Sequence, residues 1–92
     1  MMYIIIMNIN QLISIIKNKL KNNILFEDIN IEDKKFLHKG HKSHEDGKFH
    51  IKITIKSSEL KELNKIKSTK KIYSILQEEL KTHIHSIQIL IN

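Results

Sequence analysis

The chain has 92 residues, with 16 basic residues against 10 acidic ones, a formal net charge of +6 and no cysteine. This length allows one small hydrophobic core but no deep, enclosed active site. The lack of cysteine excludes disulfides, a thiol nucleophile and a metal cluster held by thiolates of this chain alone. Every basic residue is lysine, and isoleucine and asparagine are heavily used, a bias typical of an AT-rich genome. The positive charge is therefore interpreted first as a solvated surface and only second as a sign of nucleic-acid binding.

Residues 1–7 form an apolar segment that is too short to span a membrane. The segment also lacks the basic start and the small-residue cleavage site of a secretory signal peptide. We expect a short apolar extension over residues 1–7, with Met7 as an alternative start of translation, followed by one domain over residues 8–92. We expect the protein to be cytoplasmic and to have no membrane partner.

Two hydrophobic patterns predict the first elements of the domain. Between residues 9 and 21, apolar residues recur mostly at spacings of three and four. This periodicity predicts an amphipathic helix, for which Asn8 or Asn10 is a suitable N-cap. Residues 25–32 predict a first strand. Isoleucines at positions 51, 53 and 55 then alternate with polar residues, which predicts a second strand with one buried and one solvated face.

Two helices are predicted after the second strand. The candidate N-caps are Ser58 for a short helix over residues 59–64, and Ser68 or Thr69 for a longer helix that continues to residue 81. An apolar stripe on the longer helix is expected to face the core. Glu78 and Glu79 are expected to face water rather than the core.

The end of the chain predicts a third strand and, with it, the topology of the sheet. Strands one and two are joined by a loop and should be antiparallel, whereas strands two and three are separated by helices and should be parallel. Parallel strands start at the same end of a sheet, so the loop before strand two and His85 should lie together. His85 has the same side-chain parity as Ile87 and Ile89, which predicts that core packing fixes its orientation.

A loop with His38, His41 and His44 precedes the second strand and contains both glycines of the chain. Glycine adopts backbone angles that other residues resist, so it suits such a loop. Neutral imidazole is a good ligand for iron and zinc. No histidine pair has the spacing of a helical zinc site and no cysteine accompanies the histidines, so a zinc site made by this chain alone is not expected. His44, His50 and His83 are expected to be surface or local hydrogen-bonding residues.

Four stretches of the sequence resemble the BolA family, in the family's order and over almost the whole chain after Met7. These are Asp33 with the loop His38-Lys39-Gly40-His41, then His50-Ile51-Lys52-Ile53, then Tyr73-Ser74-Ile75-Leu76-Gln77-Glu78-Glu79-Leu80, and finally Ile84-His85-Ser86-Ile87. Two segments depart from the family, and the first is the usual Phe-x-Gly, which is replaced around Leu60-Lys61-Glu62. This chain has Ser68-Thr69-Lys70-Lys71 where the family has an Arg-His-Arg run before the tyrosine.

The resemblance implies an α+β domain with a fold like the type II KH domain. The order would be helix, strand, strand, helix, helix, strand, with a three-stranded mixed sheet. The resemblance also implies an adaptor that binds a monothiol glutaredoxin and shares a bridging 2Fe–2S cluster with it, in iron–sulfur trafficking or iron regulation. His85 is implied as one ligand and His38 or His41 as a second, while the glutaredoxin and glutathione supply sulfur. The isolated chain is then expected to carry no cluster and to be a monomer or a weak homodimer.

A KH-like transcriptional regulator that binds DNA or RNA is the alternative function. Lys65, Lys67, Lys70 and Lys71 would provide its positive charge. No Gly-x-x-Gly loop accompanies these lysines, and aromatic residues, on which bases stack, make up only 5% of the chain. An enzyme is not expected, because the sequence indicates neither a Ser-His-Asp triad nor a phosphate-binding glycine motif.

Overall fold

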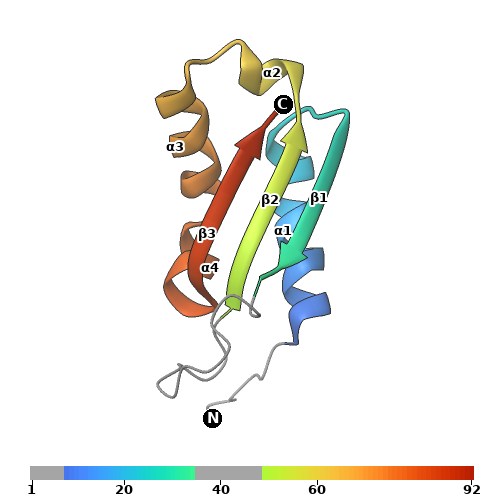
Figure 1. Cartoon of the computed structure of the whole chain (residues 1–92), viewed down its shortest axis with the longest axis vertical. Helices are drawn as coiled ribbons and strands as arrows, with labels where there is room; N and C mark the ends of the chain where they lie inside the picture. The colour runs from blue at the N-terminus through green and yellow to red at the C-terminus, as the bar shows by residue number, and fades with distance from the viewer. Residues whose placement is uncertain (1–7, 35–48) are drawn as a thin grey trace.

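The computed structural model describes residues 8–34 and 49–92 (Figure 1). The elements in this part of the chain are α1 (Ile9–Asn23), β1 (Asp28–Asp33), β2 (Phe49–Lys56), α2 (Ser58–Lys61), α3 (Lys65–Ile75), α4 (Gln77–Thr82) and β3 (Ile84–Ile91). The strands form one sheet in the order β1-β2-β3. In Figure 1, α1 crosses behind the sheet, while α3 and α4 lie next to β3. The predicted α+β class is confirmed.

The sheet has the mixed topology that the sequence predicts. β1 and β2 are antiparallel, with Ile31 opposite Ile53, and β2 and β3 are parallel, with Ile53 opposite Ile89. The crossover between the parallel strands contains α2, α3 and α4. β2 is therefore the central strand, the starts of β2 and β3 lie at one end of the sheet, and their ends lie at the other.

The core lies between one face of the sheet and the helices. Ile51, Ile53 and Ile55 of β2 are at most 2% exposed, as their alternation with polar residues predicts. The fully buried residues that the helical segments contribute are Leu12, Ile16 and Leu20 of α1, Leu60 of α2, and Ile72 and Leu76 of α3 and its C-cap. The apolar stripe predicted for the first helix is thus its buried face.

One of the two predicted N-caps begins α1. Asn8 Oδ1 accepts a hydrogen bond from Gln11 N at 2.8 Å, and Asn8 N donates to Gln11 Oε1 at 3.1 Å. These reciprocal bonds form a capping box, which satisfies N–H groups that have no partner within the helix.

Among the described residues, no helix is long and apolar enough to cross a membrane.

The predicted start of the first strand and the predicted cap of α2 are both wrong. β1 begins at Asp28 instead of residue 25, and Leu25 is 77% exposed. Ser57 caps α2 in place of Ser58. The Ser57 hydroxyl is fully buried, accepts a hydrogen bond from Leu60 N at 3.1 Å and donates one to Leu25 O at 2.6 Å. Ser57 therefore caps the helix and holds the segment before β1 at the same time.

α3 begins earlier than the predicted caps Ser68 and Thr69. Asn64 is the N-cap, and its Oδ1 accepts a hydrogen bond from Lys67 N at 2.8 Å. Ser68 lies buried within the helix, where its hydroxyl donates to the carbonyl of Lys65 at 3.0 Å. A serine in the first turn of a helix was thus mistaken for its cap.

The single long helix predicted after residue 68 is divided at Leu76. This residue has φ −99° and ψ 17°, and separates α3 from α4. After the break Glu78 is exposed as predicted, but Glu79 is only 7% exposed. Lys19 of α1 accounts for the burial, because its Nζ lies 2.7 Å from Glu79 Oε2. The prediction that Glu79 faces water is wrong, because it could not include a partner 60 residues away in the sequence.

Lys19→Met should destabilise the fold by about 1–3 kcal/mol, because it removes the ion-pair partner of a buried carboxylate. Glu79 depends on this partner, since its other oxygen, Oε1, is buried without a hydrogen bond among the described residues. Lys17 is exposed on the same helix, and Lys17→Met should change the free energy of unfolding by less than about 0.5 kcal/mol. Urea unfolding measures both effects, and equal losses would contradict the assignment.

The same substitution has a defined pH dependence. The hydrogen bond to Glu79 raises the pKa of Lys19 above its ordinary value, although partial desolvation opposes the shift. A group whose pKa is higher in the folded than in the unfolded protein stabilises the fold, and this contribution is fully present at pH values below the pKa of the unfolded state. The contribution is lost as the pH rises through the pKa of the folded state. The difference in stability between the parent chain and Lys19→Met should therefore be constant at neutral pH and shrink in alkaline solution.

Candidate functional site

The starts of β2 and β3 bring three histidines to one end of the sheet. Phe49 lies opposite Ile84, and its N–H donates to the carbonyl of His83 at 2.8 Å. His50 and His85 are the next residues on the two strands. The parallel pairing that the sequence predicts therefore places His85 beside the start of strand two.

His50 and His85 form a ring contact. Their ring centroids are 4.9 Å apart, and the planes meet edge to face at 65°. Nδ1 of His50 also shares a hydrogen bond of 2.7 Å with Oγ of Ser86. Hydrogen bonds of this kind orient histidines that bind metals, because they restrain the ring and fix its tautomer. Ser86 thus restrains His50, and His50 lies against His85.

An irregularity in the parallel ladder explains the position of His85. β2 advances by one residue, from Phe49 to His50, while β3 advances by two, from Ile84 to Ser86. His85 is the additional residue, and bulges of this kind redirect a side chain. Ile84 is 3% exposed, whereas His85 is exposed. The prediction that core packing orients His85 is therefore wrong, and the ring of His50 is a neighbour that restrains it.

Two adjacent imidazoles form part of a ligand set suited to iron, zinc or copper. Within residues 8–34 and 49–92, no group of three or more histidine, cysteine or acidic side chains is placed to hold a metal ion. An ion bound by His85 would therefore take further ligands from outside the described residues. The predicted candidates His38 and His41 lie there, as does His44.

His83 makes the local hydrogen bond that the sequence predicts for it, whereas the hydrogen bond of His50 joins two strands and is not local. Nδ1 of His83 lies 2.7 Å from Oγ1 of Thr82, where α4 ends. The contact between His50 and His85 was missed, because it depends on strand register and on the added residue. One feature of the sequence does bear on the neighbours of His50. Because side chains alternate along a strand, His50 and Ser86 fall on the same, outer face of neighbouring strands.

The four lysines of the alternative function lie on α3. Lys65, Lys67 and Lys70 are exposed. Lys71 is partly buried, and its Nζ lies 2.9 Å from Oε2 of Glu59. That hydrogen bond lowers the pKa of Glu59 from its ordinary value. Lys71 thus joins α3 to α2, while nucleic-acid binding by this lysine set stays a prediction.

Solved structures with this architecture provide the first comparison. BolA1 from Arabidopsis thaliana is similar to this chain with a TM-score of 0.72 and 29% sequence identity, over 86% of this chain and 87% of that one. The BolA domain of SufE1 from Arabidopsis thaliana gives a TM-score of 0.71 and 25% identity over the same shares. BolA1 from Mus musculus, at 19% identity, has a similar fold with a TM-score of 0.67, over 84% of this chain and 60% of that one.

Sequence comparison gives a family assignment. A search of curated proteins returns no significant match. The family model described as BolA-like protein, however, matches residues 20–92, which include the three strands and the helices between them. The match extends over most of the chain and agrees with the resemblance of its four sequence stretches. The chain belongs to the BolA-like family.

Proposed function

We propose that this BolA-like protein is a non-enzymatic adaptor that binds a monothiol glutaredoxin and shares a bridging 2Fe–2S cluster with it through histidine ligands, in iron–sulfur trafficking or iron regulation. The observation that carries the proposal is the contact between His85, which is exposed, and His50 at one end of the sheet. Membership of the BolA-like family supports the adaptor role.

The available side chains suit such a cluster. Imidazole binds iron, and histidine in place of thiolate raises the reduction potential of a 2Fe–2S cluster. Because the chain has no cysteine, the sulfur ligands would come from the glutaredoxin and from glutathione. His85 would be one ligand of this chain, and His38 or His41 the second.

The contribution of this chain is to present His85 in a restricted orientation. The ring contact with His50 limits the rotamers of His85, and the hydrogen bond to Ser86 limits those of His50. Less conformational entropy is then lost when the ligand binds iron. Since His85 is exposed near the start of β3, a second protein would have access to it.

His85→Ala should abolish or severely weaken cluster retention in the complex with a monothiol glutaredoxin, because it removes the restrained imidazole. His83→Ala is the matched control, since the side chain of His83 hydrogen-bonds to the neighbouring residue Thr82. The two variants are co-expressed with the glutaredoxin, and the visible spectrum and the cluster lifetime of each complex are measured after circular dichroism has confirmed folding. An unchanged lifetime for His85→Ala would return this histidine to a structural role.

The second ligand is tested in the same way. In sequence, His38 is nearer than His41 to the end of β1 at Asp33, and His41 follows the flexible residue type glycine at Gly40, so we expect His41 to lose more entropy on binding iron. His38→Ala should therefore change the visible spectrum and the cluster lifetime more than His41→Ala does. The opposite order would identify His41 as the ligand.

Ser86→Ala should shorten the lifetime of the cluster severalfold, up to about tenfold, because it releases the ring of His50 that restrains His85. Ser86→Thr keeps the hydroxyl group and suits a strand, so it should retain most of the lifetime. The measurement is the decay of cluster absorbance in the purified complex. If Ser86→Thr shortens the cluster lifetime as much as Ser86→Ala does, the hydroxyl group of Ser86 is not what stabilises the cluster.

A further inference from the structure

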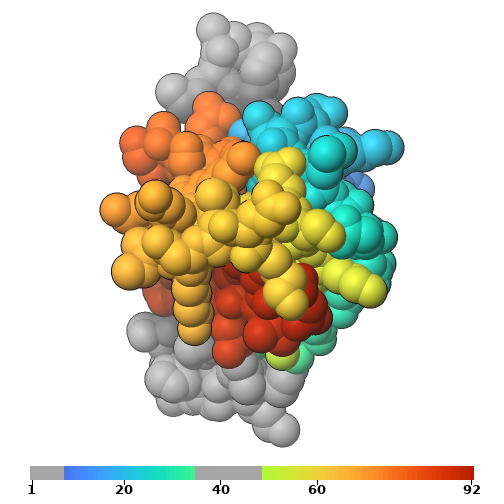
Figure 2. All heavy atoms as spheres, turned by 90° about the horizontal axis from the view of Figure 1, so that it is seen from above, coloured from blue at the N-terminus to red at the C-terminus, as the bar shows by residue number. Residues whose placement is uncertain are grey.

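A groove lies at the opposite end of β3 from His85. It has a volume of about 310 Å³, and residues of α2, α3 and β3 line it. In Figure 2, α2 and the start of α3 lie beside the end of β3. A strand rises about 3.3 Å per residue, so the groove residues Ile89 and Ile91 lie roughly 13–20 Å along β3 from His85. The groove is therefore separate from the histidine end of the sheet.

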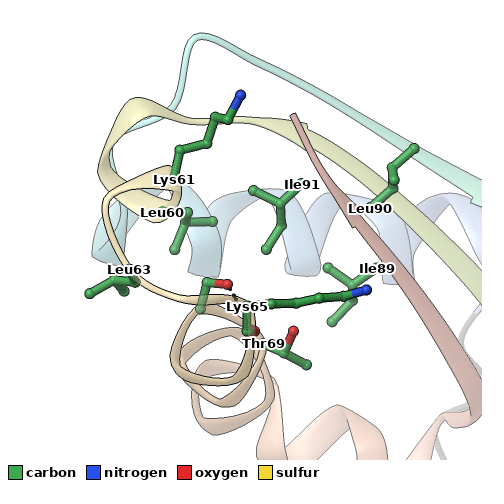
Figure 3. Close-up of a pocket in the computed structure, with 9 residues that line it drawn as sticks. Leu60, Lys61, Leu63, Lys65, Thr69, Ile89, Leu90 and Ile91 are labelled. Carbon is green, nitrogen blue, oxygen red and sulfur yellow. Dashed lines mark hydrogen bonds between the residues drawn. The ribbon is translucent and has the colours of Figure 1, made fainter.

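The groove combines an aliphatic surface with cationic side chains. Leu60, Leu63, Ile89 and Ile91 provide the aliphatic part, and Lys61 and Lys65 provide the charge. In Figure 3, the side chain of Lys65 extends along the groove toward Ile89. No carboxylate lines the groove, and neither lysine forms an ion pair with a described residue. These two lysines differ from Lys19 and Lys71, whose charges are paired.

The strand beside the groove has unpaired backbone groups. β3 is an edge strand of the sheet. Asn92 N donates to Ile55 O at 2.8 Å, and Asn92 O accepts from Ser57 N at 3.3 Å, so the backbone groups of Asn92 face β2. Because orientation alternates along a strand, those of Ile89 and Ile91 face away from β2. Within the described residues, no hydrogen bond outside the ladder reaches them.

We propose that this groove binds an extended, acidic peptide segment of another protein, which adds to the sheet beside β3. The backbone of the peptide would pair with the outward N–H and C=O groups of Ile89 and Ile91, as in other cases of strand addition. Apolar side chains of the peptide would pack on Leu63 and on the partly exposed side chains of Ile89 and Ile91. Its carboxylates would pair with Lys61 and Lys65.

The groove fits a peptide better than a single-stranded nucleic acid. Bases bind by stacking on aromatic rings, and none of the residues that line the groove is aromatic. The outward groups of a strand edge match the spacing of a second peptide backbone, which a sugar-phosphate chain does not reproduce. The positive charge of the groove favours an acidic occupant. A second copy of this chain, which has a net charge of +6, is therefore a poor candidate.

The test uses a fluorescein-labelled octapeptide of alternating aspartate and valine, and fluorescence anisotropy with the full chain. Lys61→Glu combined with Lys65→Glu should weaken binding by at least about tenfold. Lys67→Glu combined with Lys70→Glu makes the same change in net charge on exposed lysines that do not line the groove. This control pair should weaken binding by less than about threefold.

Backbone pairing is measured separately. Hydrogen exchange at the amides of Ile89 and Ile91 should slow when the peptide is added, and the peptide with N-methyl groups on alternate nitrogens should bind at least about tenfold more weakly. Circular dichroism of each variant confirms folding before binding is measured.

Four results would overturn the proposal. The first is no binding of the octapeptide at millimolar concentration. The second is equal weakening by the two lysine pairs, which would indicate non-specific attraction. The third is tighter binding of an oligothymidine that depends on Lys61 and Lys65, which would assign the groove to nucleic acid. The fourth is a concentration-dependent dimer whose Ile89 and Ile91 amides are protected without peptide, which would assign it to a second copy.

Discussion

Burial of one face of β2 is the constraint on which the rest of the structure depends. Ile51, Ile53 and Ile55 are almost completely buried, and each such side chain contributes about 1.5–3 kcal/mol. Because side chains alternate along a strand, a shift of one residue would move all three to the solvent face. The loss, roughly 4.5–9 kcal/mol, is comparable with the total stability of a small domain, about 5–15 kcal/mol. The register of both neighbouring strands is therefore strongly specified.

The register of the strands determines where the candidate functional residues lie. Parallel pairing of β2 and β3 brings their starts together, and with them His50 and His85. The irregular step in the ladder occurs before the first paired isoleucines, so one residue is added to β3 without loss of core packing. Ile84 stays buried while His85 becomes exposed. The same pairing leaves the other edge of β3 open beside α2 and α3, where the groove lies.

The sequence was sufficient wherever a pattern extends over a whole element. The apolar stripe of α1, the alternation in β2 and the order of the elements predicted the α+β class and the mixed sheet. Predictions failed where the outcome depends on a single residue. For example, Ser57 and Ser58 are adjacent in the sequence, and Ser57 caps α2 in place of Ser58. Glu79 was misplaced because its burial depends on Lys19, which is distant in sequence. For the site, the end of the sheet that holds His85 was predictable, but its contact with His50 was not, because an added residue leaves no periodic signal.

The two ends of β3 are joined by a segment that pairs with the buried part of β2. Between His85 and the groove, Ile87 pairs with Ile51, and the groove residue Ile89 pairs with Ile53; both partners on β2 are buried. A movement at one end reaches the other only if β3 slides against β2, and the packing of β2 opposes such a shift in steps of one residue. Occupancy of the groove should therefore leave the restraint on His85 unchanged, and the reverse also holds. Partners bound at the two proposed sites would therefore be held independently, because the sites lie at opposite ends of β3.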